Sequence, residues 1–155
     1  MRRSRLFLLA AGAALAFAAA VCVGCKQEEE EEPWDAMVIK DGVLVRWRGA
    51  EGDVAIPNGV TSIGEDAFSG CTSLERITIP AGVTSIGRSA FSRCKSLASI
   101  TIPAGVTSIG SYAFSSSSIT VINFNGTTAG WKAITKGVGW NYLISPLIQC
   151  TDGNL

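Results

Sequence analysis

The chain contains no histidine among its 155 residues. Histidine is the side chain most used for acid–base catalysis near neutral pH, and it is the commonest nitrogen ligand of metal ions. Its absence excludes serine–histidine–aspartate triads and histidine-based zinc sites. The sequence also lacks a carboxylate pair, a nucleophile–base set and a phosphate-binding glycine loop. We therefore expect a protein that is not an enzyme, with no catalytic residue, no metal site, no cofactor and no small-molecule substrate.

An excess of positive charge is lacking as well. Lysine and arginine together number 13, and so do aspartate and glutamate. Arg2, Arg3 and Arg5 lie in a segment that we expect to be removed, and without them 10 basic residues face 13 acidic ones, a net charge near −3. A nucleic-acid-binding protein needs a net basic face that displaces phosphate counterions. Nucleic acid is therefore not an expected partner.

The long apolar run of this chain stands at its N-terminus. Residues 1–24 combine a basic start, an apolar stretch from Leu6 to Val23, and Gly24 directly before Cys25. This pattern resembles a bacterial lipoprotein signal peptide, and the resemblance implies cleavage before Cys25 and lipidation of that residue. An ordinary secretory peptide and a retained membrane span remain alternatives. Cys22 is a second candidate anchor, although valine before it is a poor cleavage residue.

Residues 25–36 are expected to form an acidic linker behind the lipid anchor. Glu28 to Glu32 are five consecutive glutamates, which repel one another and stay solvated. Cation binding is the alternative, but adjacent glutamates lack the spaced ligands of a calcium loop. The sequence therefore favours an extended spacer.

Three copies of one unit occupy residues 56–124. Ile56 to Thr78 and Ile79 to Thr101 agree at 16 of 23 positions, and a third copy begins at Ile102. Such a unit cannot bury its apolar side alone and must stack on a copy. Proline after each strand-like segment ends the strand, and Gly64 and its equivalents permit a turn into a short helical piece. Five apolar ladders are expected: Ile56, Ile79 and Ile102; Val60, Val83 and Val106; Ile63, Ile86 and Ile109; Phe68, Phe91 and Phe114; and Ile77, Ile100 and Ile122.

The repeated string VTSIGxxAFSxCxSLxxITIP resembles the BspA-type leucine-rich repeat of bacterial surface proteins. The resemblance implies an α/β repeat solenoid of the leucine-rich-repeat kind, with short parallel β-strands, short helical turns and a parallel sheet on its concave side. It also implies a surface that binds other proteins or host matrix and has no active site.

Caps are expected at both ends of the solenoid. Residues 37–55 should form an N-terminal capping hairpin, because Asp41-Gly42 joins two short β-type runs, with Trp47 as a capping aromatic. Residues 125–155 should form a mixed C-terminal cap. It would contain a turn at Asn125-Gly126, a helix from Ala129 to Ile134 and a strand from Leu147 to Cys150, with Trp131, Ile134 and Trp140 covering the last coil.

Cys71 and Cys94 take the same position in neighbouring copies. Adjacent coils lie roughly 5 Å apart, which a disulfide can span in an exported protein. The alternative is a ladder of two buried thiols, which the parallel direction of stacked side chains favours. Cys150 is expected to be a buried strand residue.

Strand alternation predicts the surface that meets a partner. If Ile77 and Ile79 point inward, their neighbours point out. This predicts a candidate partner-binding surface of Arg76, Thr78, Ser99, Thr101, Val121 and Asn123. Arg88 and Tyr112 stand at positions that change between copies, at the start of the helical piece, and are further candidates.

Two functions fit these features. The first is a membrane-anchored cell-surface repeat protein, adhesin-like, that binds a protein or extracellular-matrix ligand. The second is a periplasmic-facing structural lipoprotein that organises envelope proteins. Both place the chain in the bacterial cell envelope, and the first predicts surface exposure.

Overall fold

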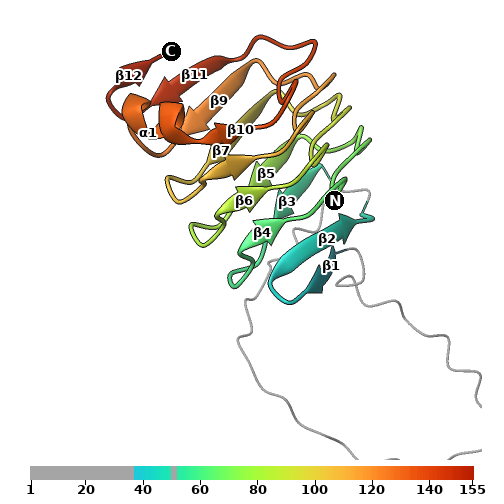
Figure 1. Ribbon diagram of the computed structural model, residues 1–155. Helices are drawn as coiled ribbons and strands as arrows, with labels where there is room; N and C mark the ends of the chain where they lie inside the picture. The colour runs from blue at the N-terminus through green and yellow to red at the C-terminus, as the bar shows by residue number, and fades with distance from the viewer. Residues whose placement is uncertain (1–36, 50–51) are drawn as a thin grey trace, which may run out of the picture. The chain divides into compact units, whose positions relative to one another are not determined.

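The computed structural model describes residues 37–49 and 52–155. Within these residues the chain winds into a stack of similar coils, which follow one another from β1 to β12 in Figure 1. The predicted repeat solenoid is confirmed. The predicted signal peptide, lipidation at Cys25 and acidic linker lie outside the described residues.

The stack begins with a β-hairpin. Strands β1 (Met37–Lys40) and β2 (Val43–Trp47) pair antiparallel, as the Asp41-Gly42 turn predicts. Both turn residues have positive φ, 49° and 76°, which that turn type requires. Leu44 is the fully buried residue of β2, because it pairs with Ile63 in the first repeat. The hairpin therefore shares the Ile63 ladder.

One wall of the stack is a six-stranded sheet in the order β1-β2-β4-β6-β8-β10. After the hairpin its strands are parallel and only two residues long: β4 (Ser62–Ile63), β6 (Ser85–Ile86), β8 (Ser108–Ile109) and β10 (Thr135–Lys136). Each isoleucine stacks on its equivalent in the next copy and is buried. Strands β4, β6 and β8 follow the Pro-Asn-Gly or Pro-Ala-Gly corner of their coils, whereas β10 follows residues 128–134.

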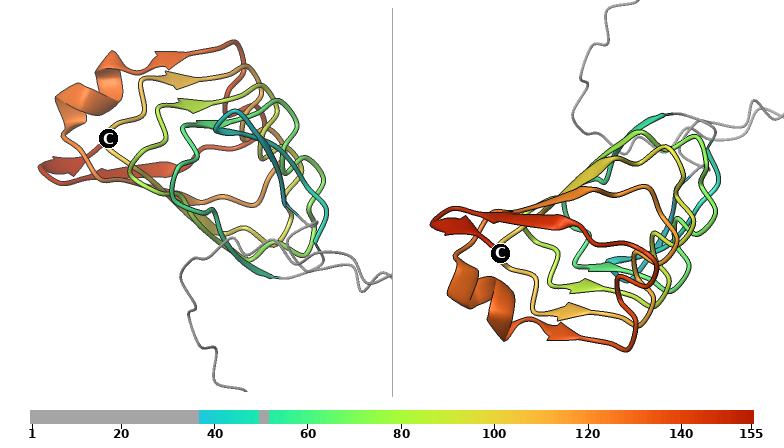
Figure 2. Two further views of the ribbon diagram at one scale, coloured as in Figure 1. Left: turned by 90° about the horizontal axis from the view of Figure 1, so that it is seen from below. Right: turned by 90° about the horizontal axis from the view of Figure 1, so that it is seen from above.

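The second wall consists of two sheets. Strands β3 (Asp53–Ala55) and β5 (Arg76–Thr78) pair parallel. Strands β7 (Ser99–Ile102), β9 (Val121–Phe124) and β11 (Leu147–Cys150) form a parallel sheet, and β12 (Gly153–Asn154) adds to β11 in antiparallel fashion. The resemblance implies one parallel sheet on the concave side, whereas the structure has strands on two walls, seen end-on in Figure 2. Asp53–Ala55 continues the second wall and does not pair with the β1–β2 hairpin.

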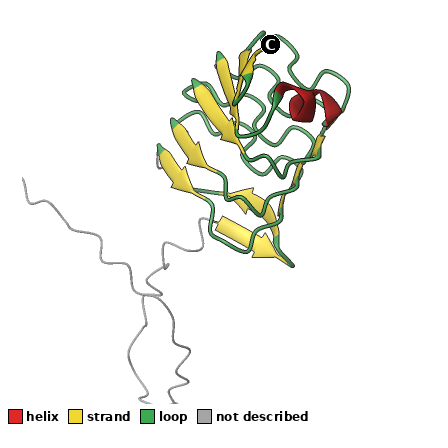
Figure 3. Ribbon diagram, turned by 90° about the vertical axis from the view of Figure 1, so that its left-hand side faces the viewer, coloured by secondary structure: helices red, strands yellow, loops and turns green. Residues whose placement is uncertain are grey.

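The Ala-Phe segments connect the two walls through hydrogen-bonded turns (Figure 3). Each turn has left-handed backbone at two positions. Asp66, Ser89 and Tyr112 fill the first position with φ between 51° and 58°, and Gly70, Arg93 and Ser116 fill the second. The described part of the chain contains one α-helix, α1 (Thr128–Ala133), so the expected helical pieces of the repeats are single turns.

A column of aromatic rings runs through the core along the stack. Phe68, Phe91 and Phe114 are fully buried, and their ring centroids lie 5.1 and 5.7 Å apart in nearly parallel planes. Trp47 extends the column at one end at 6.3 Å from Phe68, and Trp140 extends it at the other at 6.1 Å from Phe114. The predicted phenylalanine ladder is confirmed, and tryptophan covers both of its ends.

The glycines at the start of the turns have a role that differs from the expected one. Gly64, Gly87 and Gly110 do not adopt positive φ. A Cβ built on Gly87 would lie 2.6 Å from the carbonyl carbon of Gly64, and one on Gly110 would lie 2.6 Å from that of Gly87. These residues are glycine because adjacent backbones touch there, not because the turn needs special dihedral angles.

The C-terminal segment adds a further, diverged coil at the end of the stack. The sequence predicts its helix and its strand at nearly the observed positions, α1 and β11. Between them, β10 stacks on β8, and residues 138–143 repeat the turn of the earlier copies. Trp131 and Ile134 are buried and Trp140 packs against the core, as expected for residues that cover the last coil. The turn at residues 125–126 leads into Thr127, whose hydroxyl caps α1.

Lys136 occupies the ladder position of Ile109. Its ammonium donates hydrogen bonds to the carbonyls of Trp131 and Ile134, at 2.6 and 3.0 Å, and lies 4.8 Å from the Trp131 ring centre. Partial burial lowers the pKa of this lysine. The lysine thus supplies a donor to the Ile134 carbonyl and a second donor to the Trp131 carbonyl, which also accepts from the Ile134 N–H.

The three cysteines of the described part are free thiols. Cys94 is buried, and its sulfur donates to the Phe68 carbonyl at 3.2 Å. Burial is the main reason that the pKa of Cys94 is raised to about 12, and the charge of Cys71 is the second reason. The structure thus agrees with the thiol alternative for the Cys71–Cys94 pair. Cys150 is a half-buried strand residue on β11.

Candidate partner-binding surfaces

The outward positions of the second wall form a flat strip, here called the strand strip. Its members come from β3, β5, β7, β9 and β11 in register: Asp53, Ala55, Arg76, Thr78, Ser99, Thr101, Val121, Asn123, Leu147 and Gln149. Six of these are the strand residues that the sequence predicts for partner binding. The four on β5 and β7 are exposed, and Val121 and Asn123 are half-buried. The alternation thus places them on one surface.

The strand strip changes character along the stack. At one end Arg76 lies 3.7 Å from Asp53 in an ion pair that is open to water and contributes little to stability. The remainder is uncharged, with a row of hydrogen-bonding side chains formed by Thr78, Thr101, Asn123 and Gln149. Such a surface can exchange hydrogen bonds with a partner.

Arg88 and Tyr112 lie away from the strand strip, in the turns that follow β6 and β8. Arg88 is exposed and lies 3.8 Å from Glu65, its equivalent in the previous copy. Tyr112 is 39% exposed and packs edge-on against Tyr142. The eight predicted residues therefore divide between two surfaces rather than forming one.

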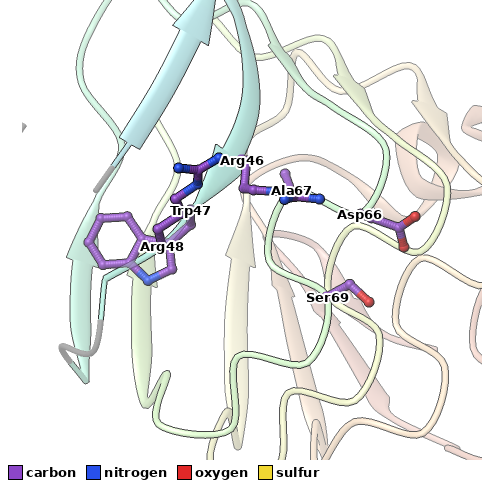
Figure 4. A pocket seen from close by; sticks show the side chains of 6 residues that line it. All are labelled: Arg46, Trp47, Arg48, Asp66, Ala67 and Ser69. Atoms are coloured by element: carbon purple, nitrogen blue, oxygen red, sulfur yellow. The ribbon is translucent and has the colours of Figure 1, made fainter. Parts of the chain in front are cut away.

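A hollow of about 660 Å³ opens beside the hairpin, lined by Arg46, Trp47, Arg48, Asp66, Ala67 and Ser69 (Figure 4). It lies where the end of β2 faces the turn of the first repeat, because the Trp47 N–H donates to the Ala67 carbonyl at 2.8 Å. The Trp47 ring lies 6.3 Å from Phe68 at a tilt of 35° and extends the aromatic column there.

Arg46 and Arg48 give this hollow its chemistry. Both are exposed, and within residues 37–49 and 52–155 neither guanidinium forms an ion pair. Arginine and tryptophan are frequent at the centres of protein interfaces. The arginine guanidinium binds carboxylates and stacks on planar groups. The sequence reading treats Trp47 as a cap and misses the two arginines.

The described residues contain no group of three histidine, cysteine, aspartate or glutamate side chains that could hold a metal ion. In the same ranges, every buried side-chain nitrogen or oxygen has a hydrogen-bond partner.

A model of the "BspA type Leucine rich repeat region" matches residues 52–136 in six copies. The matched region covers more than half of the chain. The chain belongs to this family. The BspA-type repeats thus extend beyond the three copies evident by eye, into the first coil at β3 and the last at β10.

Solved structures of bacterial leucine-rich repeat proteins resemble this BspA-type chain. A leucine-rich repeat protein from T. pallidum is 27% identical with a TM-score of 0.52, over 64% of this chain and 56% of that one. A leucine-rich cell surface protein from Faecalibacterium prausnitzii is 26% identical with a TM-score of 0.42, over 60% and 38%. A third, from Bacteroides capillosus, is 22% identical with a TM-score of 0.36, over 59% and 99%.

The BspA-type chain therefore spans little more than half of the T. pallidum protein. The comparison with curated proteins gives no match. Within the described residues, α1 is far too short to cross a membrane, and no other helix there could do so.

Proposed function

We propose that this BspA-type repeat protein is anchored by lipid at Cys25 in the bacterial cell envelope and displayed on the cell surface. There it binds a protein or extracellular-matrix ligand, as an adhesin does, without catalysis. Membership of a family of bacterial surface proteins supports a binding role. The signal-like segment at residues 1–24 and the acidic run behind it support an anchored, extended presentation.

The observation that carries this proposal is the strand strip. Its inward neighbours, such as Ile77 and Ile100, are the same in successive copies because they fill the core. Of its outward positions, one differs in every copy, as Arg76, Ser99 and Val121 show, and packing does not constrain it. A rigid, flat and uncharged row of hydrogen-bonding groups recognises another polypeptide better than a small molecule, since it encloses no volume.

Replacing Thr101 by arginine is expected to weaken binding to the ligand roughly tenfold or more, about 1.4 kcal/mol, because a long charged side chain would stand in the middle of the strip. Binding is measured on immobilised collagen, laminin and fibronectin by surface plasmon resonance. Thr107→Arg is the matched control, because Thr107 is an exposed threonine beside β8 on the other wall. Equal effects of the two variants would place the binding surface elsewhere.

Replacing Cys25 by alanine is expected to move the chain from the membrane fraction to the soluble fraction and to abolish incorporation of labelled fatty acid. The several acyl chains of a lipoprotein hold it on the membrane through about 0.8 kcal/mol for each buried methylene group. Cys22→Ala is the control and should change neither readout. Lipid labelling that survives Cys25→Ala and disappears in Cys22→Ala would transfer the anchor to Cys22.

Proteolysis of intact cells separates surface display from the periplasmic alternative. A displayed chain is removed by external protease, whereas a periplasmic-facing one is protected until the outer barrier is opened. Protection on intact cells, together with no binding to any of the three matrix proteins, would contradict the proposed function.

A further inference from the structure

The turns of successive coils are joined by a repeated set of three backbone hydrogen bonds. Each turn donates three N–H groups, from every second residue, to three carbonyls of the following coil. The first set joins Asp66 to Arg88, Phe68 to Ala90 and Gly70 to Ser92, at 2.8–2.9 Å. The last set joins Tyr112 to Val138, Phe114 to Trp140 and Ser116 to Tyr142, at 2.8–3.2 Å.

The last coil has the same three donors, and no coil follows it among the described residues. Its equivalent N–H groups belong to Gly139, Asn141 and Leu143, and none of them has an acceptor among the described residues. On the other wall, β12 pairs with β11 and covers that edge. Strand β10 pairs with β8 alone. The C-terminal end of the stack is therefore capped on one wall and open along residues 135–143.

Apolar side chains surround these open donors, and we call them the end patch: Tyr112, Val138, Tyr142 and Leu143. Val138 is 76% exposed, Leu143 73% and Tyr142 56%. The rings of Tyr112 and Tyr142 meet edge to face at 6.3 Å, and the Tyr112 ring lies directly against Gly139. Large exposed apolar residues gathered in one place mark interaction sites more often than isolated ones do.

Two features of Leu143, its exposure and its backbone conformation, are energetically unfavourable in the free chain. Its side chain lies in water, and its backbone has φ of +65°, a left-handed conformation that branched or bulky residues rarely adopt. The first repeat has Gly70 at the equivalent position, where glycine relieves this strain. Backbone strain at an exposed leucine is explained if the leucine side chain has a contact to make.

We propose that this open edge binds a polypeptide segment of a partner protein, which adopts the turned backbone of a further coil and takes its place. Within the stack, the carbonyls that meet such donors also come from every second residue of a turn, as Arg88, Ala90 and Ser92 do. The N–H row is electrostatically positive and matches that carbonyl row, which saccharides and lipids do not offer. The end patch receives the apolar side chains of the same segment. This inference rests on the proposed protein-binding function and names a second contact surface for it.

A second copy of the chain is a poorer occupant. Tail-to-tail contact would set the donors of Gly139, Asn141 and Leu143 against the same donors of the other copy. Head-to-tail contact would meet the hairpin, where β1 already pairs along β2. Sedimentation equilibrium of the complete chain in detergent is therefore expected to show a monomer. A dimer abolished by Leu143→Asp would assign the edge to a second copy and overturn the proposal.

The decisive test supplies the segment at high local concentration. A copy of residues 87–98, with its cysteine changed to serine, is fused behind Leu155 through a Gly/Ser linker of about 12 residues, which spans ~19 Å on average. In the chain, this segment accepts the first set of three hydrogen bonds. The linker gives an effective concentration in the millimolar range, so weak binding is detected. Amide hydrogen exchange of the complete fused chain in detergent is measured residue by residue.

Exchange at Gly139, Asn141 and Leu143 is expected to slow at least tenfold relative to a fusion that carries the same twelve residues in scrambled order. Leu143→Gly in the fusion should reduce this protection while the chain keeps or gains thermal stability, because glycine suits the left-handed backbone. A purely structural Leu143 predicts unchanged protection. Equal exchange in the native-order and scrambled fusions would overturn the proposal. The fusion involves no matrix protein, so its failure leaves the test of the strand strip unaffected.

Discussion

Replacing Phe91 by alanine is expected to lower the free energy of unfolding by about 3–5 kcal/mol, which is much of the stability of a small domain. Phe91 is fully buried between Phe68 and Phe114, at ring distances of 5.1 and 5.7 Å. Its loss leaves a cavity in the middle of the column. Because each coil contacts only its neighbours, such a gap weakens both halves of the stack. Urea unfolding followed by circular dichroism measures the change.

Tyr142→Ala is the matched control, since Tyr142 is an aromatic residue that is 56% exposed at the end of the stack. Its replacement is expected to change the free energy of unfolding by less than about 0.5 kcal/mol. A Phe91→Ala effect no larger than that of the control would show that the aromatic column is not a main source of stability.

The aromatic column illustrates what the sequence could predict. Phe68, Phe91 and Phe114 stand 23 residues apart, so the repeat alone aligns them, and the same holds for the isoleucine ladders. The outward residues of β5 and β7 follow from alternation once the inward ones are known. These inferences succeed because a stack of like coils turns sequence period directly into spatial position.

The last coil shows where this reasoning fails. Its strand β10 has Lys136 where the earlier copies have isoleucine. Trp140 continues the aromatic column, although it does not stand 23 residues after Phe114. The α1 insertion lengthens the spacing, so a fixed period cannot find the coil. The pairing of β10 with β8 and the contact of Gly137 with Ser111 identify it as a copy. Which N–H groups of this coil lack an acceptor depends on how the coils stack, and the amino-acid sequence contains no motif that indicates it.

The binding surfaces were predicted less completely for a similar reason. The sequence predicts Arg88 and Tyr112 as further candidates at the start of the helical piece. Alternation within a strand does not say on which face of the coil that turn lies. The hollow at Arg46 and Arg48 depends on how the end of β2 faces the turn of the first repeat, and no sequence motif indicates that arrangement.

Replacing Gly87 by alanine is expected to destabilise the domain by about 3 kcal/mol or more, beyond the usual effect of a small overpacking change. The added Cβ would lie 2.6, 2.7 and 2.8 Å from the Gly64 carbonyl carbon, its oxygen and the Glu65 nitrogen. All three are backbone atoms, so no side chain can move aside. The coils must separate, which lengthens the 2.7 Å hydrogen bond from the Gly87 N–H to the Ile63 carbonyl.

Gly82→Ala provides the control, because a Cβ there meets only the Val60 carbonyl oxygen at 3.6 Å, an ordinary contact. It should be neutral or stabilising by up to about 1 kcal/mol through the unfolded chain. Urea unfolding compares the two, and equal stabilities would refute close backbone contact as the reason for glycine. Since the distance between coils also spaces Arg76, Ser99 and Val121 along the strand strip, Gly87→Ala is expected to weaken ligand binding at temperatures where the domain is still folded.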